Sequence, residues 1–340
     1  MKTVKVEDSV GMVLCHDITK IIPGEFKGRA FKKGHIIRAE DIPVLLSLGK
    51  DHIYVWEMNS GDVHENDAGI RLAQAVRGAG ISLTEPSEGK VQLIAEYDGM
   101  CIIDEDLLYQ INLIDDMVVA TRNNYRPVKK GDVVAGVRVI PLMINNEKLK
   151  QAEEIARDKE VISILPFKEH KVGIVVTGNE VYYGRIKDRF SPVIRKKVED
   201  YGSEVIDQII VPDDADQIAA AINKLISQGA NLIMASGGMS VDPDDVTPSG
   251  IRQTGAEIIS YGAPVLPGSM MLVAYLDGIP VLGLPGCVMY HKTTVFNLLL
   301  PFVMSGLKIT RTMIARLGLG GLCLNCEECR YPNCSFGTGF

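Results

Sequence analysis

The sequence lacks the features that would mark a membrane protein, an exported protein or a nucleic-acid-binding protein. No apolar run reaches about 18 residues, so we expect no membrane-spanning helix. The opening stretch MKTVKVEDSV carries charges where a signal peptide needs an apolar core. The net charge of −7 argues against a nucleic-acid partner, which would select a basic surface. We therefore expect a cytoplasmic protein that binds neither nucleic acid nor membrane.

The chain also lacks internal repeats, low-complexity tracts and evenly spread cysteines. Its 340 residues are 46% hydrophobic and 23% charged, which is typical of a globular protein with two or three domains. Cys15, Cys101 and Cys287 stand alone, whereas four more cysteines crowd the C-terminal end. In a chain without an export signal, such a cluster indicates a metal or cluster site before it indicates disulfides.

Two small α+β domains are expected before residue 166. In residues 1–60, the alternating stretch KTVKV predicts a strand, and RAEDIPVLLSLGK predicts a helix that ends at Gly49. Residues 61–165 are predicted to form a middle domain with the strand candidates MVVATRN and DVVAGVRVIPLMI. The pattern of this middle domain is the least regular in the chain.

Residues 166–306 alternate strands and helices, which predicts an α/β domain with a mostly parallel sheet. The apolar runs KVGIVVTG and ANLIMASGG are typical of strands buried on both faces. Between them, Ser191 is predicted to cap a helix whose first residue is Pro192. Residues 307–340 form a Cys-rich tail.

Three turns of the predicted sheet share one edge. TGNE follows the first strand, SGGMSVDPDD follows the third, and GLPGCV follows the last. Ligands of open parallel sheets bind beyond the carboxyl ends of the strands. Glycine allows backbone N–H groups to approach a ligand, and clustered N–H groups attract phosphate. Gly237, Gly238 and Gly286 therefore suit an anionic, phosphate-bearing ligand, although turns between strands and helices need glycine in any case.

Carboxylates surround these glycines. Asp242, Asp244 and Asp245 would repel a phosphate unless a divalent cation lay between them. Asp188 and Asp213 follow the first and second strands. Two plainer interpretations remain open: the acidic loop could serve solvation, and PDDADQ is also an ordinary acidic helix start.

Residues 171–306 resemble the molybdopterin-binding domain of molybdenum-cofactor biosynthesis proteins. The resemblance rests on VVTGNEVYYGRIKD, on ASGGMSVDPDDVTP and on APVLPGSMM followed by GIPVLGLPG. The stretches VEDSVGMVLCHDIT and FKKGHIIRAEDIPVLLSLGKDHIYVW are similar to the beginning of molybdotransferases.

The resemblance implies a three-layer α/β/α fold and molybdopterin, or its adenylated form, as ligand. The implied reaction is a transferase reaction: molybdate is inserted, the adenylate is hydrolysed and AMP is released, assisted by Mg²⁺. A homo-oligomer, a dimer or a trimer, is also implied.

Site residues follow from the resemblance by position. The residues implied to line the pterin-phosphate site are Thr177, Gly178, Glu180, Gly237, Gly238, Ser240, Pro285 and Gly286. The residues implied to bind metal or to position water are Asp188, Asp213 and Asp245, with Asp245 as the metal ligand.

Two departures from the family pattern leave the reaction open. Asp242 and Pro243 replace the usual Gly and Asp, and Cys287 and Val288 replace Asn and Pro after Leu-Pro-Gly. Cys287 is either a substitute ligand or a small buried residue. The alternative to an enzyme is a non-catalytic molybdopterin carrier, inserter or sensor. A generic nucleotide-binding protein is a third interpretation, against which the joint motif matches weigh.

The tail carries Cys323, Cys326, Cys329 and Cys334 in the spacing C-x2-C-x2-C-x4-C. This spacing is near the bacterial ferredoxin run and also suits zinc with four thiolate ligands, so an iron–sulfur cluster and Zn²⁺ stay open. Four unligated thiols in a disordered tail are the plain alternative. A metal-bearing tail would serve docking on a client molybdoenzyme, redox sensing or sulfur handling.

Overall fold

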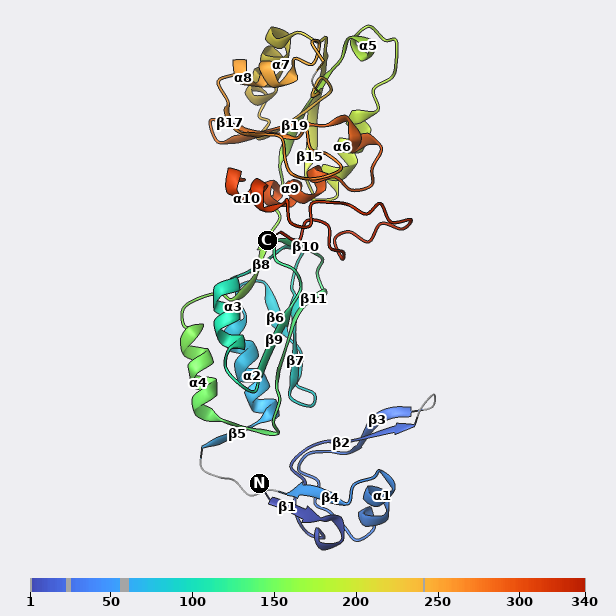
Figure 1. The fold of residues 1–340 in the computed structure, drawn as a ribbon, viewed down its shortest axis with the longest axis vertical. Coiled ribbons are helices and arrows are strands. Elements are labelled where there is room, and N and C mark those ends of the chain that lie inside the picture. The colour runs from blue at the N-terminus through green and yellow to red at the C-terminus, as the bar shows by residue number, and fades with distance from the viewer. Residues whose placement is uncertain (1, 23–25, 56–60, 241, 340) are drawn as a thin grey trace. The chain divides into compact units, whose positions relative to one another are not determined.

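The computed structural model describes residues 2–22, 26–55, 61–240 and 242–339 (Figure 1). The chain divides into two compact units. Unit 1 comprises residues 1–94, 104–121 and 133–162, and unit 2 comprises residues 95–103, 122–132 and 163–340. Unit 2 thus contains every predicted site residue. The predicted domain boundary at residue 60 lies outside the described residues.

Unit 1 contains short strands and helices in both of its predicted domains. The elements of the first are β1 (Lys2–Lys5), η1 (Val6–Asp8), β2 (Ile18–Ile22), β3 (Phe26–Phe31), α1 (Asp41–Ser47) and β4 (His52–Val55). The others are β5 (Asp62–His64), α2 (Glu65–Val76), β6 (Ile81–Leu83), β7 (Lys90–Ala95), α3 (Glu105–Asn112), β9 (Met117–Thr121), β11 (Val133–Val139), β12 (Met143–Asn145) and α4 (Asn146–Ile155). Strands β6, β7, β11 and β9 form a four-stranded sheet in that order.

Unit 2 contains the α/β domain that the alternating pattern predicted. Its elements are β8 (Gly99–Ile103), β10 (Arg126–Val128), β13 (Ile162–Pro166), β14 (Lys171–Thr177), α5 (Asn179–Tyr182), α6 (Phe190–Glu199), β15 (Glu204–Val211), α7 (Ala215–Ser227), β16 (Leu232–Ser236), α8 (Thr247–Gln253), β17 (Glu257–Tyr261), β18 (Leu272–Leu276), β19 (Ile279–Leu284), η2 (Gly286–Met289), α9 (Val295–Met304) and α10 (Arg311–Arg316).

A six-stranded sheet organises unit 2. Its strand order is β15-β14-β16-β19-β18-β17. Strands β15, β14, β16 and β19 run parallel, whereas β18 and β17 complete one edge as antiparallel strands. The sheet is therefore mostly parallel, as predicted, and the carboxyl ends of four strands meet at one edge.

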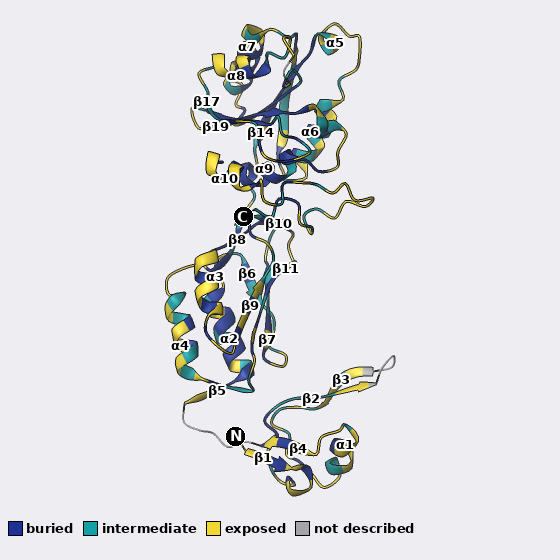
Figure 2. Cartoon of the chain, viewed as in Figure 1, coloured by how far each residue is buried: buried dark blue, intermediate teal, exposed yellow. Residues whose placement is uncertain are grey.

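Helices cover both faces of this sheet. Along β14, Val172, Ile174 and Val176 pack into one core with α6 and α9, and Val175 packs into a second core with α7 and α8. Successive residues of a strand point to opposite faces of the sheet. Since helices cover both faces, all four side chains are buried (Figure 2). Gly173 allows α7 to approach, since a Cβ there would lie 2.9 Å from the Cβ of Leu225. The predicted three-layer α/β/α fold is confirmed.

Two helix starts differ in how they are capped. Asp214 caps α7, because its side chain accepts a hydrogen bond from the Gln217 N–H at 3.0 Å. The predicted Ser191 cap of α6 is wrong. The helix already begins at Phe190, and the carboxylate of Asp188 accepts hydrogen bonds from the N–H groups of Phe190 and Ser191 at 2.8 and 3.2 Å. A carboxylate suits this place because it faces the positive end of the helix dipole.

No helix in the described part of the chain is long and apolar enough to cross a membrane. The most apolar helix is α9, whose Phe296 and Phe302 are almost fully buried in unit 2. Helix α9 therefore belongs to the interior of a folded unit.

Phe296→Ala is expected to lower the free energy of unfolding by about 3–5 kcal/mol, because it opens a cavity in the core between α9 and the sheet. Urea denaturation followed by circular dichroism measures this. Leu319→Ala is the control, since Leu319 is 75% exposed and its removal should change stability by no more than about 0.5 kcal/mol. Similar losses in both variants would contradict the packing described for α9.

Candidate functional site

The site is assembled where the loops after β14, β16 and β19 come together. Gly237 and Gly238, which follow β16, have φ angles of 94° and 52°. A Cβ at Gly237 would lie 2.1 Å from the carbonyl oxygen of Thr177, and a Cβ at Gly238 would lie 2.9 Å from Oγ1 of Thr247. Only glycine combines these backbone angles with such close approach. The glycine pair is therefore required by the geometry of two neighbouring turns.

Hydrogen bonds of buried hydroxyl groups connect these turns. Oγ1 of Thr177 lies 2.9 Å from Oγ1 of Thr247, and it donates a hydrogen bond to the carbonyl of Ser236 at 3.3 Å. Both threonines are buried. Thr177 thus supports the glycine pair from behind, instead of lining the cavity in front of it.

A cavity of about 570 Å³ lies in front of the glycines. Six predicted site residues line it: Gly237, Gly238, Ser240, Asp245, Pro285 and Gly286. Asp242 and Cys287, where the sequence departs from the family pattern, line it as well. The two departures therefore lie at the place where a ligand would bind.

The segment from Leu266 to Met270 forms another wall of this cavity. No site residue was predicted in this segment from the sequence, although APVLPGSMM is one of the stretches that carry the resemblance. The Pro267-Gly268 dipeptide was the available signal. Gly268 has a φ of 116°, and a Cβ there would lie 2.6 Å from a side-chain carbon of Val295. This turn is consequently held close to the beginning of α9.

Tyr261 fixes the chain just after the glycine pair. Its hydroxyl donates hydrogen bonds to the carbonyls of Met239 and Ser240 at 2.8 and 3.2 Å. Burial raises the pKa of Tyr261, and the charge of Asp245 raises it further. The phenol therefore stays protonated near neutral pH and keeps its role as donor.

Asp213 follows β15 and lies near the glycine turn. One of its oxygens accepts a hydrogen bond from the Asn179 N–H at 2.9 Å, and the other would lie 3.6 Å from a Cβ at Gly238. Burial raises the pKa of Asp213 despite the hydrogen bond from Asn179. The charges of Glu180, Asp244 and Asp245 raise it further. Asp214, not Asp213, serves as the helix cap in PDDADQ.

The remaining predicted residues lie outside the cavity lining. Asp188 caps α6 and also accepts a hydrogen bond from the side-chain amide of Gln208 at 2.8 Å. Gly178 is buried at the start of α5, where its φ is 139°. Glu180 is exposed, and its charge acts on Asp213. The charges of Glu180 and Asp245 thus both act on Asp213, whereas both oxygens of Asp188 accept hydrogen bonds from other parts of unit 2.

Asp213 and Asp245 suit a divalent cation whose remaining ligands come from a bound anion and water. Asp213, Glu180, Asp244 and Asp245 form no ion pair with a described Lys, Arg or His. No three His, Cys, Asp or Glu side chains among the described residues stand ready to hold one metal ion. Mg²⁺ needs only one or two protein carboxylates when phosphate oxygens and water supply the rest. Burial raises the pKa of the Cys287 thiol, so this thiol stays protonated near neutral pH in the absence of a metal ion.

Comparison with known families places the glycine site in a recognised domain. Residues 173–305 match the family described as "probable molybdopterin binding domain". Residues 3–57 match a family described only as a domain of unknown function (DUF8806). The family resemblance expected for the α/β domain is thereby confirmed.

Curated relatives match parts of the same region. A molybdopterin molybdenumtransferase of Synechococcus elongatus is 29% identical over 145 residues, which are 39% of this chain and 36% of that protein. A CinA-like protein of a Mycobacterium species is 38% identical over 90 residues, 26% of this chain and 21% of that protein. The matched region thus spans about a third or less of the length of these two relatives. The two relatives carry different names.

Solved structures give weak similarity. The molybdopterin biosynthesis enzyme MoaB of Thermus thermophilus is 21% identical, with a TM-score of 0.33 over 39% of this chain and 91% of that one. A molybdopterin biosynthesis MoeA protein of Pyrococcus horikoshii is 16% identical, with a TM-score of 0.34 over 89% of this chain and 74% of that one.

Gly237→Ala is expected to destabilise unit 2 by about 2 kcal/mol or more, because the added methyl group meets the Thr177 carbonyl and the φ angle disfavours alanine. Gly286→Ala is the matched control, since a Cβ there meets no atom within 4 Å. Thermal unfolding of both variants measures the difference. Equal unfolding temperatures would show that the two turns do not approach as described.

Asp213→Asn is expected to stabilise the protein near neutral pH in the presence of a chelator. The raised pKa means that the folded state resists ionisation of Asp213, so stability falls as pH rises from the unfolded pKa through the folded one. Asparagine removes this penalty and keeps an acceptor for Asn179. Because Asp213 is only half-buried, solvent screening keeps the gain below about 1 kcal/mol.

Denaturation of both proteins across the acid range measures this effect. The two curves should meet at a pH below the unfolded pKa and separate above it. A variant that is less stable than the natural protein at neutral pH would contradict the cause assigned to the shift.

Proposed function

We propose that this chain, whose residues 173–305 belong to the molybdopterin-binding domain family, binds molybdopterin or its adenylated form in the glycine-lined cavity. The observation that carries the proposal is the close approach of Gly237 and Gly238 to the turn after β14. Their backbone N–H groups and the exposed hydroxyl of Ser240 suit a phosphate group. The cavity volume of about 570 Å³ suits a small organic ligand.

The proposed reaction is molybdate insertion with hydrolysis of the adenylate. Water attacks the phosphoanhydride, which gives AMP and molybdopterin with its terminal phosphate. The two dithiolene thiols then replace one oxide of molybdate, which leaves as water with the two thiol protons. Asp245, which lines the cavity, and Asp213, whose Oδ1 would lie 3.6 Å from a Cβ at Gly238, would hold Mg²⁺ and orient the attacking water. Bound Mg²⁺ supplies charge neutralisation at the phosphates. Asp188 is proposed to act indirectly, by fixing the start of α6.

Binding without turnover is the second candidate function. Asp242 and Cys287 line the cavity at positions where the sequence departs from the transferase pattern. A carrier, inserter or sensor would need the glycine turns but not the full set of catalytic groups. In either case we expect a homo-oligomer in the cytoplasm that delivers the bound cofactor to a client molybdoenzyme.

Asp245→Ala is expected to preserve folding and to slow AMP release from adenylated molybdopterin by about a hundredfold, since a carboxylate for Mg²⁺ is lost. The assay contains molybdate and Mg²⁺ and measures AMP by chromatography. Asp244→Ala is the matched control, because Asp244 lies in the same loop but does not line the cavity. It should keep most of the activity.

The natural protein separates the two candidate functions. Tight pterin binding without AMP release would support the binding role and exclude the transferase role. Failure to bind either form of molybdopterin would exclude both.

A further inference from the structure

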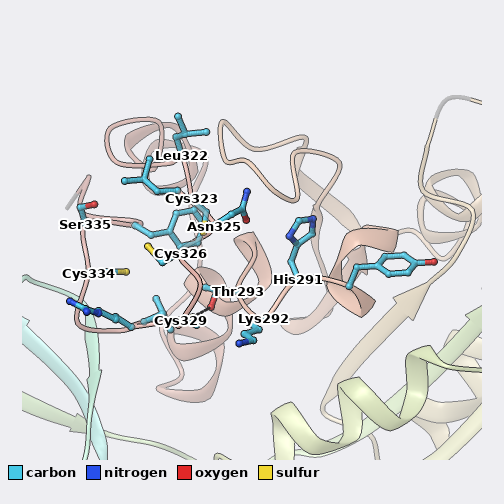
Figure 3. A pocket seen from close by; sticks show the side chains of 15 residues that line it. His291, Lys292, Thr293, Leu322, Cys323, Asn325, Cys326, Cys329, Cys334 and Ser335 are labelled. Carbon is cyan, nitrogen blue, oxygen red and sulfur yellow. Dashed lines mark hydrogen bonds between the residues drawn. The ribbon is translucent and has the colours of Figure 1, made fainter.

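The four cysteines of the tail line one cavity of about 220 Å³ (Figure 3). Cys326 and Cys329 are exposed, whereas Cys323 and Cys334 are half-buried. The opposite wall comes from residues 290–293, which follow η2. Oγ1 of Thr293 lies 3.1 Å from the sulfur of Cys329. Thiols that are separated along the tail thus face a common space.

The cysteine-rich tail is hydrogen-bonded to, and packed against, the rest of unit 2. The N–H of Cys323 donates to the carbonyl of Leu266 at 2.8 Å, and the N–H of Leu266 donates to the carbonyl of Gly321 at 2.8 Å. The hydroxyl of Tyr331 donates to the carbonyl of Asn297 at 2.8 Å. Phe336 is only 3% exposed within the core. These contacts weigh against the alternative of a disordered tail.

A buried cation lies beside the cysteines. Arg126 is 4% exposed, and its Nη2 donates to the carbonyls of Phe336 and Cys334 at 2.6 and 3.3 Å. Its guanidinium lies 5.6 Å from the ring centre of Tyr331. Its Nε has no hydrogen-bond partner, and no described carboxylate forms an ion pair with it. Burying an unpaired cation costs several kcal/mol, unless negative charge is supplied nearby.

We propose that Cys323, Cys326, Cys329 and Cys334 bind a [4Fe–4S] cluster in this cavity. Four thiolates on such a cluster carry net negative charge, which would balance Arg126. The run C-x2-C-x2-C matches the way a ferredoxin loop presents three cysteines to one cluster.

The geometry favours a cluster over a single ion. Zinc requires four sulfurs at about 2.3 Å from one point. No three cysteines among the described residues stand that close together. The ligands of a cubane cluster bind four different irons and therefore stand farther apart around a shared volume. The four tail cysteines line such a shared volume, a cavity of about 220 Å³.

Two short connections link the cluster site to the glycine-lined cavity. Pro285, Gly286 and Cys287 line the ligand cavity, and residues 290–293 line the cysteine cavity. Leu266 lines the ligand cavity and is hydrogen-bonded to Cys323. The cluster would thus brace two walls of the proposed pterin site, although its existence does not depend on that function.

Metal analysis of the full-length chain, purified without oxygen, tests the proposal. We expect about four irons and four acid-labile sulfides per chain, with visible absorption that bleaches on reduction and an electron paramagnetic resonance signal of the reduced cluster. Cys326→Ser should lower the iron content about tenfold. Cys15→Ser is the control, because Cys15 belongs to unit 1 and a serine can keep the hydrogen bond to the Tyr54 carbonyl.

Zinc in place of iron, or no iron after reconstitution with iron and sulfide, would overturn the proposal whether or not pterin binds. The role of Arg126 has its own readout. Arg126→Gln should shift the reduction potential of the cluster to more negative values, and Arg126→Lys should restore it. An unchanged potential in Arg126→Gln would contradict the charge balance described above.

Discussion

The site depends on the close backbone contact between Gly237 and the carbonyl of Thr177. A side chain at Gly237 would meet that carbonyl at 2.1 Å, so the turns after β14 and β16 touch through their backbones. The buried pair of Thr177 and Thr247 holds them at this distance. Because both turns follow central strands of the sheet, the packed core fixes the position of the glycine pair that lines the cavity.

The same contact explains why the acidic loop stands where it does. With the glycines fixed, Asp245 lines the cavity and Asp213 lies behind Gly238. Burial, and after it the negative charges of Glu180, Asp244 and Asp245, raise the pKa of Asp213. A site that stores negative charge without a described cationic partner gains the most from binding a divalent cation together with an anionic ligand.

The α/β domain was predictable from the sequence because its signals are local. KVGIVVTG and ANLIMASGG are apolar on both faces, and glycine turns follow strands β14, β16 and β19. Other features depended on distant contacts. Asp188 is also bound by the side-chain amide of Gln208, 20 positions away, and the wall at Leu266–Met270 follows from the approach of Gly268 to Val295. Arg126 meets Cys334 across 208 positions of sequence, which no local pattern records.

The core of unit 2 is assembled from distant parts of the chain. Met100 and Phe336 are both buried in this core, although they lie near opposite ends of unit 2 in the sequence. The ring of Tyr125 stacks on the ring of Phe302 in α9, with ring centres 5.2 Å apart. Met100, Tyr125 and Phe336 all lie outside residues 173–305, the part of the chain that matches the family. A fragment cut at those limits would leave apolar surface of α9 open to water and prone to self-association. Expression boundaries for this protein should therefore follow its core, which is discontinuous in sequence.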